Sequence, residues 1–145
     1  MPGEDAERLR GFLESWTRDG PWTPETPRAG ESDLSLLHPE IVFEDSNLPD
    51  HAGELYRGHE GVRRATERWI EPFEWMTVEL EDIIEIDERI VSIHRWQAKA
   101  RETGIEFDLP LAYLWTFRDG QVTHCRSYVD PEQAISDARG EEQQA

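Results

Sequence analysis

A two-residue alternation in the second half of the chain constrains the fold more than any other feature. Over residues 107–117 the aromatic and large aliphatic side chains occupy every second position, and apart from Leu114 the positions between them hold smaller or polar residues. This period predicts a β-strand with one buried face. The Asp119-Gly120 pair that follows is typical of a tight hairpin into another strand over 122–129. Extended runs over 75–86 and 90–101 come before it, so we expect an antiparallel meander.

The first half of the chain has helical spacing instead. Apolar residues recur at intervals of three and four over 5–18, which predicts an amphipathic helix. The same spacing predicts a central helix from residue 61 to Pro72, and Asp130 is placed to cap a last helix that starts at Pro131.

Shorter elements and loops connect these helices and strands. We expect a short helix over 33–37, a first strand over 41–45, and loops over 20–32 and 47–58. Helices followed by a meander predict a single α+β domain with its core over about 5–138 and a frayed tail over 139–145.

Composition excludes several functional classes. The 145 residues carry a formal net charge of −17, which disfavours binding to nucleic acid or to an anionic membrane surface. No apolar run is long enough to span a membrane, and the N-terminus shows no leader. The single Cys125 cannot form an internal disulfide, which favours a cytoplasmic protein.

Three segments carry a resemblance to a known family. The sequence is similar to SnoaL-like members of the nuclear-transport-factor-2-like superfamily over about 5–138, in the segments His38-Pro39-Glu40-Ile41-Val42-Phe43-Glu44-Asp45, Tyr56-Arg57-Gly58-His59-Glu60-Gly61-Val62 and 111–122. The resemblance implies a cone-shaped α+β barrel, in which a curved antiparallel sheet wraps around helices and encloses an apolar pocket. That scaffold hosts polyketide cyclases, ketosteroid isomerases, dehydratases and non-catalytic binding modules, so the reaction stays open.

Strand periodicity then predicts which side chains line such a pocket. With the aromatic face of 107–117 turned inward and the two turns setting the register, the pocket side includes residues from three strands, and helical residues complete it. The expected substrate-binding set is Phe12, Trp16, Trp69, Trp96, Leu109, Leu111, Trp115, Cys125 and Ser127.

Three residues are candidates for proton transfer. Asp45 ends the first strand, in a segment that resembles the one carrying the general base of ketosteroid isomerases, and an apolar pocket would raise its affinity for a proton. Tyr113 matches the position of an acid that donates a hydrogen bond to the enolate in that family. His94 suits a proton relay. Each also has a structural interpretation: a solvated strand end, a packed tyrosine and a core histidine bonded to a neighbour.

The resemblance also shows one departure. The tyrosine that ketosteroid isomerases carry on the first helix falls here between Phe12 and Trp16, where no hydroxyl is available. Half of an oxyanion hole would be missing, which argues against steroid isomerisation.

No cofactor or metal is expected. The histidines His51 and His59 lie near acidic residues, but their spacing fits no recognised metal site, and the sequence holds neither a phosphate loop nor a dinucleotide fingerprint. Cys125 has no evident activating base.

The sequence therefore predicts a cofactor-independent isomerase or cyclase acting on a small hydrophobic cyclic or polyketide-like molecule. A binding module of the same fold and a scytalone-type dehydratase are the alternatives. The outer sheet face, with Arg95, Lys99 and Arg126, is a surface through which the superfamily commonly forms homodimers, so the resemblance implies a homodimer.

Overall fold

The computed structural model describes residues 3–18, 21–25, 35–45 and 54–140 of the chain. Within these ranges the helices are α1 (Glu4–Arg18), α3 (Gly58–Ile70) and α4 (Pro131–Ala138). The strands are β1 (Leu37–Asp45), β2 (Glu54–Arg57), β3 (Phe73–Ile86), β4 (Arg89–Ala100), β5 (Glu106–Arg118) and β6 (Gln121–Tyr128). The predicted α+β fold class is confirmed.

All six strands form one sheet in the order β2-β1-β6-β5-β4-β3. The meander from β3 to β6 is antiparallel, as expected, whereas β1 pairs with β6 in parallel, so the sheet is mixed. Its edge strands, β2 and β3, do not pair with each other, so the curved sheet is not closed into a full barrel.

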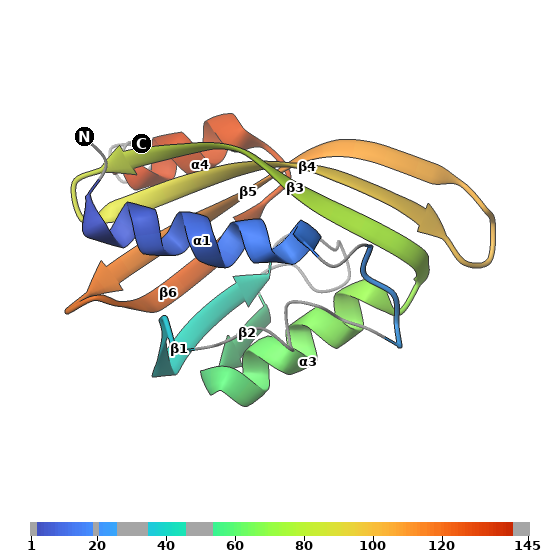
Figure 1. Ribbon diagram of the computed structural model, residues 1–145, viewed down its shortest axis with the longest axis horizontal. Helices are drawn as coiled ribbons and strands as arrows, with labels where there is room; N and C mark the ends of the chain where they lie inside the picture. Colours follow the sequence, from blue (N-terminus) through green and yellow to red (C-terminus); the bar gives the residue numbers. More distant parts are fainter. Residues whose placement is uncertain (1–2, 19–20, 26–34, 46–53, 141–145) are drawn as a thin grey trace.

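The two faces of the sheet carry two separate hydrophobic clusters. The larger cluster lies on the inner face, which we define as the face with Trp96, Tyr113, Trp115 and Cys125, and α1 and α3 cover it (Figure 1). The smaller cluster lies on the outer face, where α4 packs on β4, β5 and β6. Helix α4 thus covers part of the face on which a homodimer was expected.

The first strand differs from its predicted bounds. It starts at Leu37 and passes through Pro39, where we expected a short helix and a stop; residues 33 and 34 lie outside the described ranges. The register of β1 on β6 shifts between Leu37 and Val42, around the proline that has no N–H to donate. The four-residue strand β2 lies in a segment predicted as a loop, because so short a run shows no readable period.

The helices and turns follow the sequence closely. Asp130 caps α4 by accepting a hydrogen bond from the backbone N–H of Glu132 at 3.0 Å. At the hairpin between β5 and β6, Asp119 and Gly120 have φ angles of 53° and 80°, the left-handed conformation that this pair favours.

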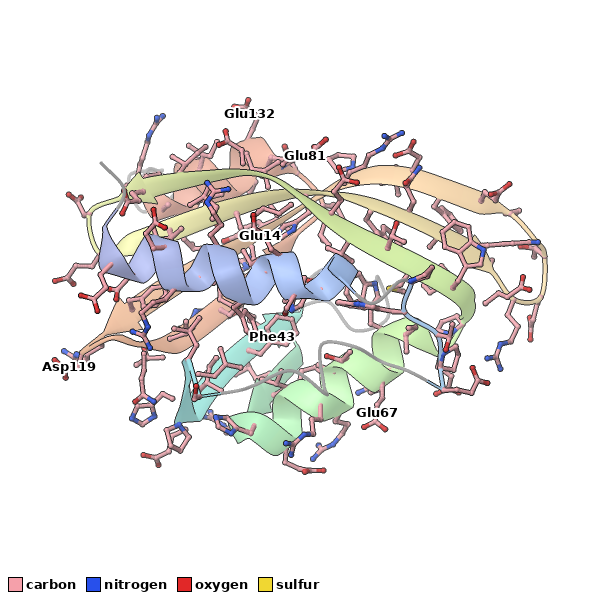
Figure 2. The ribbon with its side chains drawn as sticks, in the orientation of Figure 1. Glu14, Phe43, Glu67, Glu81, Asp119 and Glu132 are labelled. Carbon is pink, nitrogen blue, oxygen red and sulfur yellow. The ribbon has the colours of Figure 1, made fainter. Side chains whose placement is uncertain are left out.

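Charged side chains cover the surface. Glu67, Glu81, Asp119 and Glu132 point outward from the fold, whereas Phe43 lies inside it (Figure 2). No helix of the described ranges has the length and apolar character needed to cross a bilayer.

Candidate functional site

A cavity of about 60 Å³ lies between the inner sheet face and the two helices that cover it. We call it the tryptophan cavity, because four indole rings contribute to its wall. Its lining residues are Phe12 and Trp16 of α1; Leu37, Ile41 and Phe43 of β1; Val62, Ala65, Thr66 and Trp69 of α3; Tyr113 and Trp115 of β5; and Cys125 of β6. Trp22, which lies between α1 and β1 in the chain, completes the wall.

Local sequence patterns bring these side chains together. Phe12 and Trp16 are four residues apart on the buried stripe of α1. Tyr113 and Trp115 are two residues apart on β5, and Trp115 is paired with Cys125 of β6, so all three share the inner face. The ring of Trp16 contacts that of Tyr113 edge-on, with 5.7 Å between their centroids.

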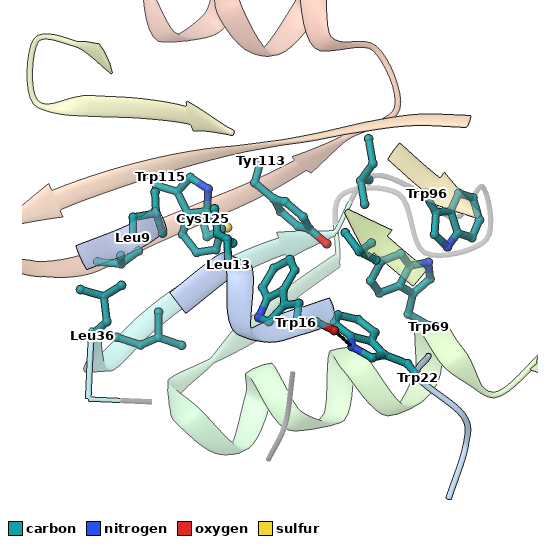
Figure 3. Packing of buried hydrophobic residues seen from close by; sticks show 14 of the residues in the cluster. Leu9, Leu13, Trp16, Trp22, Leu36, Trp69, Trp96, Tyr113, Trp115 and Cys125 are labelled. Carbon is teal, nitrogen blue, oxygen red and sulfur yellow. Dashed lines mark hydrogen bonds between the residues drawn. The ribbon is translucent and has the colours of Figure 1, made fainter. Parts of the chain in front are cut away.

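Trp22 reaches the cavity through contacts that its own segment does not encode. Its backbone N–H donates to the carbonyl of Met76 at 2.7 Å and its carbonyl accepts from the N–H of Met76 at 2.9 Å, which fixes it to the free edge of β3. Its indole N–H donates to the carbonyl of Trp16 at 2.8 Å, as the dashed line in Figure 3 marks. Sequence reasoning placed this residue in a loop and did not include it in the site.

The predicted pocket residues divide into two groups. Phe12, Trp16, Trp69, Tyr113, Trp115 and Cys125 line the cavity, while Trp96, Leu109, Leu111, Ser127 and His94 do not. Trp96 packs behind Trp69, with 5.8 Å between ring centroids, and Leu109 is 43% exposed. The inner-face assignment holds for these strands, but neighbouring side chains cover some positions and the cavity does not extend to Leu109.

His94 is buried and contacts the side chain of Ser92. Its Nε2 lies 2.8 Å from Oγ of Ser92, which also accepts the indole N–H of Trp115 at 2.8 Å. Trp16 stacks over the imidazole with an interplanar angle of 21°. Burial lowers the pKa of His94 from 6.5 to about 3, so the ring is neutral at physiological pH. A neutral imidazole with no surface on the cavity is unsuited to relaying protons to a ligand there.

The other titratable candidates have distinct positions. Burial raises the pKa of the Cys125 thiol, so its reactive thiolate form is suppressed. Asp45 is the last residue of β1 and its backbone pairs with Glu54, but its side chain lies outside the described part of the structure. No carboxylate, histidine or lysine belongs to the described wall of the cavity.

The two histidines that were considered as metal ligands are placed differently. His51 lies outside the described residues, and His59 donates through Nε2 to the carbonyl of Leu37 at 2.8 Å, tying α3 to β1. Across the described ranges, no group of three or more potential ligands among His, Cys, Asp and Glu could hold a metal ion.

Comparisons with known proteins identify the relatives of this chain. The sequence model of the SnoaL-like domain family matches residues 28–125. No match was found among curated protein sequences.

Solved structures share the fold at low sequence identity. An NTF2-like protein of unknown function from Burkholderia pseudomallei is 21% identical, with 92% of this chain and 96% of that chain covered and a TM-score of 0.70. A putative SnoaL-like polyketide cyclase from Jannaschia sp. is 18% identical, with coverages of 93% and 91% and a TM-score of 0.66. TerC, co-crystallised with polyporic acid, is 21% identical, with coverages of 91% and 97% and a TM-score of 0.65.

Proposed function

Because the chain belongs to the family of SnoaL-like domains, we propose that it binds a small planar, apolar molecule in the tryptophan cavity and transfers a proton next to a carbonyl group. Asp45 is the general base in this proposal, and Tyr113 donates a hydrogen bond to the developing oxyanion. The reaction class is that of a cofactor-independent isomerase or cyclase.

The register of β1 is the observation that carries this proposal. Ile41 and Phe43 both line the cavity, and Asp45 follows at the same two-residue spacing in a strand whose pairing with β2 continues to that residue. The register therefore puts Asp45 two positions beyond Phe43, a residue that lines the cavity. A base must reach the proton that it removes, and the position of Asp45 in the register of β1 supports this role.

The size and wall of the cavity support a small substrate. Pockets for drug-sized ligands are typically about 300–1,000 Å³, whereas this cavity is about 60 Å³. The wall is mostly aromatic, which favours a flat ring system. We therefore propose a small, flat substrate. The relative that was co-crystallised with polyporic acid supports the idea of a small-molecule ligand in this fold.

Deuterium exchange of a ketone tests the proposed chemistry without knowledge of the natural substrate. In D₂O the protein should accelerate loss of the α-proton NMR signal of 2-indanone, and Asp45→Asn should slow this exchange by about 10²- to 10⁴-fold. Asp119→Asn is the matched control, because it makes the same chemical change at an exposed turn whose φ of 53° asparagine tolerates. Exchange that stays within about threefold of wild type in Asp45→Asn would refute the assignment of the base.

A non-catalytic binding module is the second candidate. The observation that favours it is the described wall itself, in which only Tyr113 and Cys125 can titrate. Such a wall holds a ring without accepting a proton from it. Binding of 2-indanone to the wild type without any acceleration of exchange would support this candidate over the enzyme.

A further inference from the structure

The indole N–H groups around the cavity have different partners. Four tryptophans line the cavity: Trp16, Trp22, Trp69 and Trp115. The N–H of Trp22 donates to the carbonyl of Trp16, and that of Trp115 donates to Ser92. The N–H groups of Trp16 and Trp69 are buried and have no hydrogen-bond partner in the described part of the chain. Two donors in the wall therefore have no acceptor among the described residues.

Trp16 is the better placed of these two donors. Trp16 is only 5% exposed, and its ring packs against those of Phe12, Tyr113 and His94. In Figure 3 its ring nitrogen lies on the edge turned away from Tyr113, whereas the nitrogen of Trp69 lies on the side of Trp96, which is not a cavity residue. Rings on several sides hold the Trp16 indole in one orientation.

An unpartnered buried donor is costly, and an acceptor in the cavity removes that cost. An N–H group that loses water without gaining a partner is destabilising, and the penalty is relieved when a ligand supplies an oxygen. The Thr66 hydroxyl in the wall does not accept from either indole; it donates to the carbonyl of Val62 at 2.9 Å, which ties that side chain to its own helix.

We propose that the indole N–H of Trp16 donates a hydrogen bond to a carbonyl oxygen of the ligand, so that the tryptophan cavity selects aromatic ketones over hydrocarbons of the same shape. This inference rests on the proposed function, because it assumes that the cavity binds a planar ring. It adds a specificity-determining residue on α1, a helix on which no hydroxyl was available for this purpose.

Two isosteric probes test the hydrogen bond directly. Acetophenone and α-methylstyrene have the same planar skeleton, and only acetophenone has a carbonyl oxygen. In ¹H–¹⁵N spectra the indole N–H signal of Trp16, identified by its absence in Trp16→Phe, should move downfield with acetophenone and not with α-methylstyrene. The preference of the protein for acetophenone, taken as the ratio of the two Kd values, should fall about fivefold in Trp16→Phe.

Trp96→Phe is the matched control. It also removes a buried, unpartnered indole N–H, but from a residue that does not line the cavity. Its preference for acetophenone should stay within about twofold of wild type.

The outcomes separate this inference from the proposed function. If both probes bind but shift the Trp16 signal equally, the hydrogen bond is refuted while the binding site stands. If Trp16→Phe folds and its preference for acetophenone is unchanged, the hydrogen bond is likewise refuted. If neither probe binds to the wild type, both the ligand class of the proposed function and this inference are refuted. The wild-type spectra alone decide between these cases if the variant does not fold.

Discussion

Replacing His94 should remove a pH dependence of stability that its burial creates. The native pKa of His94 is about 3, against 6.5 for an ordinary histidine. Between these two values the unfolded chain binds a proton that the native protein does not, so stability rises with pH and is lost as the pH falls below 6.5. His94→Leu has no titratable group at this position and should not show this loss.

The expected size follows from the two pKa values. From pH 7 to pH 5 the linkage lowers the free energy of unfolding of the wild type by about 2 kcal/mol through His94 alone. This loss in free energy depends almost entirely on the pKa of His94 in the unfolded chain, because its native pKa lies well below pH 5. Most carboxylates of the chain are still ionised at pH 5, and the other histidines are present in both proteins, so their contributions largely cancel in the comparison.

Urea denaturation of both proteins at pH 7, 6 and 5 measures the effect. Whatever stability difference the substitution causes at pH 7, wild type should lose about 2 kcal/mol more than His94→Leu on going to pH 5. A stability difference that stays constant over this range would show that native His94 takes up a proton normally, and the account of its burial would be wrong. The imidazole proton signals of His94 should likewise stay at their neutral positions down to pH 5.

Three further stability predictions follow from the structure. Ser92→Ala should cost about 2–4 kcal/mol in urea denaturation, because it leaves Trp115 Nε1 and His94 Nε2 buried without a partner; a cost below about 0.5 kcal/mol would contradict it. Gly11→Ala should stabilise by about 0.5–1 kcal/mol, since its Cβ meets nothing within 4 Å in the middle of α1. Gly120→Ala should instead destabilise by about 1–2 kcal/mol because of its φ of 80°; equal effects at the two glycines would refute this reasoning.

Elements with a clear local period were predictable. The stripe of α1, the alternation of β5 and the turn at Asp119-Gly120 are encoded by neighbouring residues, so their type and approximate bounds follow from the sequence. Strand β2 and the early start of β1 were not predictable in this way. Four residues carry no readable period, and the His38-Pro39 pair is locally a stop signal that pairing with β6 overrides.

The candidate site shows the same division between local and long-range information. Strand alternation correctly puts His94 and Tyr113 on the inner face, yet only Tyr113 lines the cavity, because Trp16 stacks over His94. The sequence by itself determined which side of β4, β5 and β6 faces inward, since that depends on a two-residue period within one segment. Only the tertiary structure decided which of those positions stay open, because the covering side chains come from segments far away in the chain.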